Sequence, residues 1–122
     1  KAIEKRLYGP LPKGGIGVGL GGVHEYWPGG FSAIIFGWSG HLVVANMMEG
    51  SPAKTAGLLA GDEIIAIDQS AVKDLSAAEA LRRLRGEPGS EVSLSIMRDK
   101  SGNLIPFRLK RVAISDDQVG WF

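Results

Sequence analysis

Residues 14–22 are the part of the sequence whose residue types could most directly bind a ligand. They read GGIGVGLGG, so six of the nine are glycine, and Ile16, Val18 and Leu20 come at every second position. Two glycines in a row permit a sharp turn, after which the amides of Ile16, Gly17 and Val18 can point into one small concavity. Successive N–H groups of this kind bind anions, and a carboxylate there accepts charge-assisted hydrogen bonds.

The residues after the loop predict a strand with an apolar pocket beside it. Ile16, Val18 and Leu20 alternate with glycine, which is the period of a β-strand. A peptide that ends in a hydrophobic residue would place its carboxylate on the amides, its last side chain in the pocket and its backbone along the strand. We expect Gly17 to leave room for the anion, because glycine has no side chain.

Two other interpretations of the glycines stay open on the sequence alone. Gly17, Gly19 and Gly22 have the G-x-G-x-x-G spacing of a dinucleotide site, but that motif requires a strand before it and a helix opening inside it. Here a proline-containing loop precedes and a strand follows, which disfavours nucleotide binding. Alternatively, the glycines serve packing only, because glycine in a strand often marks the close approach of another backbone.

No arrangement of side chains predicts catalysis or metal binding. Ser51 and Lys54 could form a serine–lysine pair, but Ser51 directly precedes a proline and is better explained as a helix cap. His24 and His41 flank an aromatic stretch and are weak evidence for a metal site. Asp62 follows a glycine and is expected to hydrogen-bond within its own turn. We therefore expect no catalytic residue, no metal and no cofactor in this chain.

Strands and two helices are predicted to hold the glycine loop in place. A short helix begins at Pro52 after the cap residue Ser51 and stops at Gly57. The strongest helix prediction covers residues 76–85, which open with the serine–glutamate spacing of a capping box. Alternating apolar residues predict strands at 16–23, 31–38, 41–48, 63–67, 91–98 and 104–114, with a short strand at 71–72.

The composition indicates one globular domain and disfavours several classes of function. The chain has 122 residues, 44% of them hydrophobic and 22% charged, with a net charge of +1 and no cysteine. This charge provides no strong field for nucleic acid, and no apolar run reaches the roughly 20 residues of a membrane span. Two groups of basic residues, within 82–85 and 108–111, are expected to form solvated faces.

Several of these segments together resemble a PDZ domain. The X-Φ-G-Φ carboxylate loop of that family appears at residues 15–18, and residues 50–72 are similar to its short helix, Gly-Asp turn and following strand. The stretch LRGEPGSEVSLSIMR at residues 84–98, with the later FRLKRVAI, is similar to the PDZ domains of bacterial and plastid tail-specific proteases, also called carboxy-terminal processing proteases. The resemblance covers residues 14–114.

The resemblance implies a mostly β (α+β) fold. We expect a PDZ-like partly open barrel of five or six strands with one long and one short helix. The fold would be circularly permuted relative to animal PDZ domains, because the last strand takes the place of their first. Around the domain at 14–114 we expect an N-terminal extension at 1–13, a hairpin insert at 24–40 and a linker or tail stub at 115–122.

The resemblance also assigns the residues of a peptide site. The amides of Ile16, Gly17 and Val18 would bind the terminal carboxylate of the peptide. Leu81 and Leu84 would line the pocket for the last side chain, although ordinary core packing explains them equally well. The full set expected around the peptide groove is Gly15, Leu20, Ala77, Ala80, Leu81 and Leu84.

By the same resemblance, the domain would capture hydrophobic C-termini of protein substrates for a protease domain of the same parent chain. That family uses a serine with a lysine base outside the PDZ domain, so this fragment is expected to be non-catalytic. Its location would then be periplasmic or extracytoplasmic. The alternative is a PDZ interaction domain in a secretion or scaffold protein without a protease.

The two ends of the chain carry separate expectations. The first residue is not methionine, so we expect a piece of a longer protein. The other end is hydrophobic, with Trp121 and Phe122 as its last residues. Because such a tail resembles the expected ligand, it could dock in the groove of a neighbouring copy.

Overall fold

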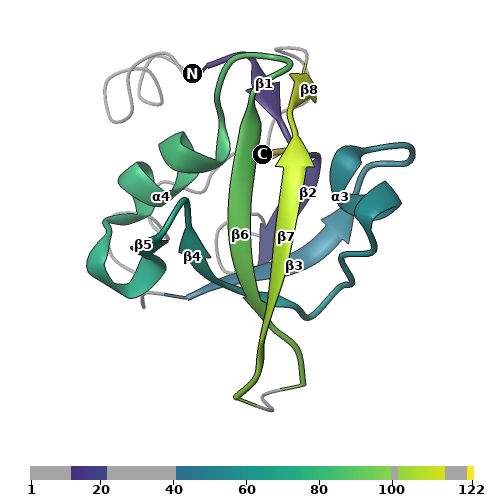
Figure 1. The fold of residues 1–122 in the computed structure, drawn as a ribbon. Coiled ribbons are helices and arrows are strands. Elements are labelled where there is room, and N and C mark those ends of the chain that lie inside the picture. Colours follow the sequence, from purple (N-terminus) through teal and green to yellow (C-terminus); the bar gives the residue numbers. More distant parts are fainter. Residues whose placement is uncertain (1–11, 22–40, 100–101, 115–120) are drawn as a thin grey trace.

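The computed structural model describes residues 12–21, 41–99, 102–114 and 121–122 (Figure 1). The insert expected at 24–40 and the strand expected at 31–38 lie outside the described residues. So do most of the expected extension 1–13 and most of the tail 115–122. What is described is a mostly β domain with one longer and one shorter α-helix.

Five longer antiparallel strands form the main sheet of the described residues, and β2 lies at its edge. In spatial order they are β2 (Val18–Gly21), β3 (Leu42–Met47), β4 (Glu63–Ile67), β6 (Glu91–Met97) and β7 (Leu104–Lys110), with the short β5 (Ser70–Ala71) paired to β4. A second small sheet pairs β1 (Gly14–Gly15) with β8 (Val112–Ala113). Alternation explains the strands, since β6 buries Val92, Leu94 and Ile96 and leaves the residues between them more exposed.

The short helix α3 (Pro52–Ala56) begins and ends at the predicted residues. The Ser51 hydroxyl accepts a hydrogen bond from the amide of Lys54 at 3.2 Å, and Gly57 ends the helix in the left-handed region with a φ of 98°. The Lys54 ammonium pairs with the carboxylate of Glu49. Ser51 therefore acts as a helix cap, as its position before proline predicts.

The longer helix α4 (Ala77–Leu84) packs its apolar face into the core. The Ser76 hydroxyl accepts from the amide of Glu79 at 3.1 Å, which is the first half of the predicted capping box. The fully buried residues of this helix are Ala80, Leu81 and Leu84. They join the strand residues in one hydrophobic cluster, and Figure 1 shows α4 and α3 at opposite sides of the sheet in that view.

The hairpin after β4 differs slightly from the prediction. Asp68 and Gln69 both have positive φ, of 47° and 73°, so the turn closes directly after β4 and brings Ser70 back to pair with Ile67. The expected strand at 71–72 is half right, because Val72 already belongs to the 3₁₀ helix η2 (Val72–Asp74).

The single long strand predicted for 104–114 is wrong, because Arg111 divides it into β7 and β8. The Arg111 side chain is only 7% exposed, which also corrects the expected solvated face. Its guanidinium donates to the main-chain oxygens of Leu84 at 3.0 Å and Arg83 at 2.9 Å. The last carbonyls of a helix lack partners within the helix and form the negative end of its dipole. Arg111 therefore caps α4.

Asp62 holds the turn before β4 to the end of β6. Its buried carboxylate accepts two hydrogen bonds of 2.8 Å from Arg98 and one of 2.9 Å from the amide of Leu59. The hydrogen bonds from Arg98 outweigh burial and hold the pKa of this carboxyl below its usual value of 3.8. The predicted local bond is confirmed, and the bond to a distant arginine is added to it.

We expect Asp62→Asn to lower the free energy of unfolding by about 2 kcal/mol at neutral pH, because the charge-assisted bonds to Arg98 are lost. A carboxyl whose pKa is lowered by folding stabilises the protein above its unfolded pKa, and this stability disappears as pH falls through the folded pKa. Denaturant titrations from pH 7 to pH 2 should therefore show the two proteins converging in acid. The exposed Asp74→Asn is the matched control, and a constant difference down to pH 2 would contradict the assignment.

Candidate functional site

The outer edge of β2 is paired with residues 121–122 of the same chain. Gly19 and Trp121 form an antiparallel bridge. The amide of Phe122 donates to the main-chain oxygen of Val18 at 2.8 Å, and the amide of Ile16 donates to the main-chain oxygen of Phe122 at 3.0 Å. Residues 121–122 thus pair with the sheet edge in the way that an added strand does. We call the main chain of Ile16, Val18 and Gly19 the docking edge.

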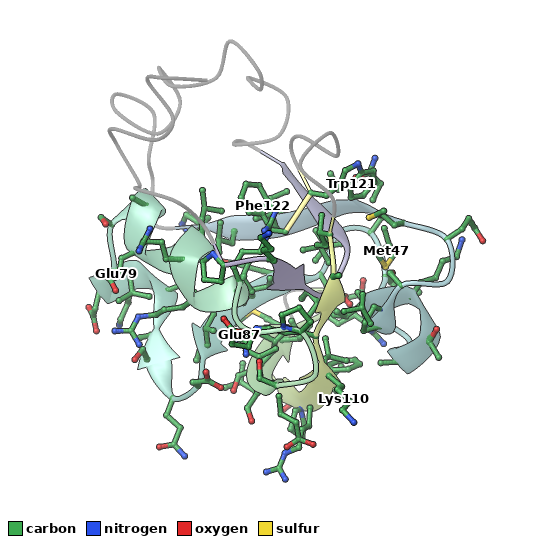
Figure 2. The ribbon with its side chains drawn as sticks, turned by 90° about the horizontal axis from the view of Figure 1, so that it is seen from above. Met47, Glu79, Glu87, Lys110, Trp121 and Phe122 are labelled. Carbon is green, nitrogen blue, oxygen red and sulfur yellow. The ribbon has the colours of Figure 1, made fainter. Side chains whose placement is uncertain are left out.

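The Phe122 side chain fills the hydrophobic space beside the docking edge. It is 2% exposed and belongs to the same buried cluster as Ile16, Val18, Leu81 and Leu84. Figure 2 shows Phe122 on the side of α4 and Trp121 farther from that helix, as the alternation of an extended segment requires. Burying a phenylalanine side chain contributes about 1.5–3 kcal/mol, so this contact is a substantial part of the local stability.

Arg85, which directly follows α4, contacts both residues of the docked segment. One guanidinium nitrogen donates to the main-chain oxygen of Trp121 at 3.0 Å, and another donates to that of Pro12 at 2.6 Å. The guanidinium carbon lies 5.8 Å from the centroid of the Phe122 ring, within the range of a cation–π contact. Arg85 therefore joins the end of α4 to the docked segment and to the chain that enters β1.

The glycine loop is held to the end of α4 by two main-chain hydrogen bonds. Gly14 donates to the oxygen of Gly86 at 2.7 Å, and Gly86 donates back to Gly14 at 3.0 Å. A Cβ added at Gly14 would lie 2.6 Å from the Gly86 oxygen, and a Cβ added at Gly86 would lie 2.6 Å from the guanidinium of Arg111. For Gly14, the packing interpretation of the glycines is therefore confirmed.

Gly17 has a reason to be glycine that differs from the expected one. Its φ is 84°, in the region that side chains rarely adopt, and an added Cβ would lie 2.4 Å from the Cβ of Ser51. The nearest obstacle to a side chain is thus the N-cap of α3. Gly17 allows the loop to pack against this helix. This packing is enough to explain the glycine, without the expected need for space around an anion.

Gly15 is the glycine that borders the docked segment. A Cβ added there would lie 2.3 Å from the main-chain oxygen of Phe122 and 2.4 Å from Cδ1 of Ile114. The first of these atoms is main chain of the docked segment, and the second is the flexible end of a side chain. Gly15 therefore provides the space in which the Phe122 oxygen sits.

The structure brings most of the predicted site residues to this edge. Ile16 and Val18 bond the docked segment through their main chains, and Leu20 continues β2 with its side chain buried. Among the helix residues, Ala80, Leu81 and Leu84 are buried in the cluster that contains Phe122, whereas the side chain of Ala77 lies outside the described residues.

Sequence reasoning missed two features of the site. The expectation of a solvated face is wrong for Arg85, because this side chain is half-buried and reaches across to residue 121. Arg85 directly precedes Gly86, which follows the end of the helix, and this position could have indicated that its side chain bonds a neighbouring segment. Nor did the sequence indicate that the last two residues pair with their own chain, as they do in this structure; docking on a neighbouring copy stays a hypothesis.

The other chemistry-bearing residues do not form a second site within the described part of the chain. Nδ1 of His41 lies 2.6 Å from a Glu63 carboxylate oxygen at the surface, and His24 lies outside the described residues. Among residues 12–21, 41–99, 102–114 and 121–122, no three His, Cys, Asp or Glu side chains are grouped to hold a metal. Across the same residues, helices long and apolar enough to cross a membrane are absent.

A family comparison agrees with the fold and the position of this edge. The family model described as "PDZ domain" matches residues 14–106. The chain therefore belongs to the PDZ domain family, and β2, α4 and the glycine loop occupy the matched region.

The relatives and solved structures indicate which kind of PDZ domain this chain resembles. The chain is 34% identical over 80 residues to the carboxy-terminal processing protease CtpB of Bacillus subtilis, covering 66% of this chain and 17% of that protein. It is 37% identical over 78 residues to the carboxyl-terminal-processing protease of a Picosynechococcus species, covering 64% and 19%.

A solved structure of the photosystem II D1 C-terminal processing protease superposes with a TM-score of 0.65 at 25% identity. It covers 90% of this chain and 26% of that one. The domain is thus of the type found in carboxy-terminal processing proteases, and it spans less than a fifth of the length of the two curated relatives.

Proposed function

We propose that the docking edge binds the C-terminus of protein substrates that end in a hydrophobic residue, for a tail-specific serine protease. The observation that carries this proposal is the pairing of residues 121–122 with the edge of β2. A peptide that paired in the same way would use the Val18 oxygen, the Ile16 amide and the buried space beside them.

The chemistry of the loop favours a free carboxylate at the end of the ligand. In the docked segment, one oxygen of residue 122 already accepts from the Ile16 amide. A free terminal carboxylate carries a full negative charge and offers two oxygens to the amides of Ile16, Gly17 and Val18, and charge-assisted hydrogen bonds are stronger than neutral ones. Gly15 supplies the space for that group.

The protease parent is supported by the names of the relatives, which are processing proteases. In such a parent the domain would deliver substrates to a serine–lysine centre outside residues 1–122 and would not itself be catalytic. Two further relatives are named as chloroplastic. For this protein we propose a periplasmic or extracytoplasmic location. A scaffold or secretion protein is the alternative parent.

We expect binding in the micromolar range, about −8 kcal/mol, because a few charged hydrogen bonds are offset by the ordering of the peptide. A peptide ending in Gly-Trp-Phe with a free carboxylate should bind at least about tenfold more tightly than the same peptide with a C-terminal amide, since one charged hydrogen bond is worth about 1.5–3 kcal/mol. Isothermal titration measures both. Equal affinities would show that the protein recognises internal residues of the peptide and would refute C-terminal recognition.

A further inference from the structure

We propose that residues 121–122 are an internal competitor for the peptide site, so that an external peptide binds only after displacing them. This inference rests on the proposed function. It adds that the site is occupied by its own chain at rest and that the ligand class is a C-terminus with an aromatic last residue.

The competition follows from the hydrogen bonds of the docking edge. One sheet edge pairs with one strand at a time, because each main-chain donor and acceptor of β2 faces a single partner on that side. The Val18 oxygen already accepts from the Phe122 amide, and the Ile16 amide already donates to the Phe122 oxygen. A second strand cannot use these two groups while residues 121–122 hold them.

The hydrophobic space beside the edge is occupied as well. Phe122 is 2% exposed and belongs to the core cluster that includes Ile16, Leu81 and Leu84. Cores are packed to the density of organic crystals, so a second large side chain does not fit beside the first. An incoming last residue must therefore replace the Phe122 ring.

The occupant also indicates which side chain the space accepts. A phenylalanine ring fills it, and the guanidinium of Arg85 lies 5.8 Å from the centroid of that ring. A cation in this position attracts an aromatic face more than an aliphatic chain. The same arginine donates to the main-chain oxygen of the preceding residue, Trp121, a contact that any peptide can offer.

A tethered competitor lowers the apparent affinity by the fraction of time for which the site is free. If residues 121–122 fill the site nine-tenths of the time, the dissociation constant measured for an external peptide rises about tenfold. A change that weakens the binding of residues 121–122 should therefore lower the measured dissociation constant by up to the same factor. The affinity of the site itself should not change, because the edge and its neighbours are unaltered.

The first experiment titrates a fluorescently labelled peptide ending in Gly-Trp-Phe, with a free carboxylate, into a protein of residues 1–122. We expect Phe122→Ser to bind this peptide about tenfold more tightly than the wild type, because the serine leaves the hydrophobic space open. The matched control is Leu104→Ser, which removes an apolar side chain that is 52% exposed on β7 and should leave the affinity unchanged.

The outcomes separate this inference from the proposed function. Equal affinity of the wild type and Phe122→Ser would overturn the competition and leave peptide binding standing. If neither protein binds, the proposed function fails and the competition fails with it. Light scattering that shows a concentration-dependent dimer would make the occupant a second copy and would overturn the internal assignment.

A second experiment uses the wild type alone, in case Phe122→Ser does not fold. In amide-resolved NMR, the Phe122 amide should exchange slowly with solvent, because it donates to Val18. Addition of the same unlabelled peptide should expose this amide with the midpoint of peptide binding, while the Ile16 amide stays protected. Binding of the peptide with the Phe122 amide still protected would overturn the proposal.

Discussion

Replacing Gly15 with alanine is expected to weaken peptide binding strongly in a domain that still folds. The added Cβ would lie 2.3 Å from the position of the Phe122 main-chain oxygen, where we propose that the end of a peptide ligand sits. Such an overlap with main chain cannot be relieved by a rotamer change. We expect affinity for a peptide ending in Gly-Trp-Phe to fall about 100-fold, which is about 2.7 kcal/mol.

The same change should displace residues 121–122 and so lower the stability of the domain. Losing the burial of Phe122 costs about 2 kcal/mol, which leaves a typical domain folded. The other close atom, Cδ1 of Ile114, can move aside. Circular dichroism and calorimetry check the fold. Gly102→Ala, where φ is 85° and an added Cβ meets nothing within 4 Å, controls for a destabilising glycine replacement away from the site and should leave peptide binding unchanged. Undiminished peptide binding by a folded Gly15→Ala would refute the location of the site.

Replacing Gly17 with alanine is expected to have a large effect on stability. The residue has a φ of 84°, and the left-handed region costs a side-chain-bearing residue about 1–2 kcal/mol. The added Cβ would also lie 2.4 Å from the Cβ of Ser51. We expect the two effects together to lower the free energy of unfolding by about 3 kcal/mol, measured by denaturant titration.

A double-mutant cycle separates the backbone strain from the overlap with Ser51. In the Ser51→Gly background the overlapping Cβ is absent, so Gly17→Ala should cost only the strain, about 1 kcal/mol. Ser51→Gly alone should cost a few tenths of a kcal/mol, because glycine is also accepted as a helix cap. An equal cost of Gly17→Ala in both backgrounds would show that packing against α3 does not require this glycine.

The helices illustrate what local sequence determines. The residues that begin and end the helices bond to groups within three or four residues of themselves. They are Ser51 before Pro52, Gly57 after the last turn of α3 and Ser76 before α4. Their hydrogen bonds close inside one turn, so the sequence pattern contains all of the partners. The apolar face of α4 is equally local, and its buried residues agree with the 3.6-residue period.

Arg111 and Arg85 illustrate what local sequence does not determine. Each lies in a basic stretch that reads as a solvated surface, yet Arg111 bonds the oxygen of Leu84 and Arg85 bonds the oxygen of Trp121. These acceptors are far away in the chain and become available only when the helix end, the loop and the last residues meet. The break between β7 and β8 has the same origin.

The sequence itself determined the order of strands and helices, the helix caps, the glycine loop and the resemblance to a PDZ domain. Each of these depends on residues that are close together in the chain. The tertiary structure alone decided that Gly17 faces Ser51, that Gly15 faces Phe122 and that residues 121–122 occupy the edge of β2. Those facts depend on which distant segments come into contact, and packing of the whole domain sets these contacts.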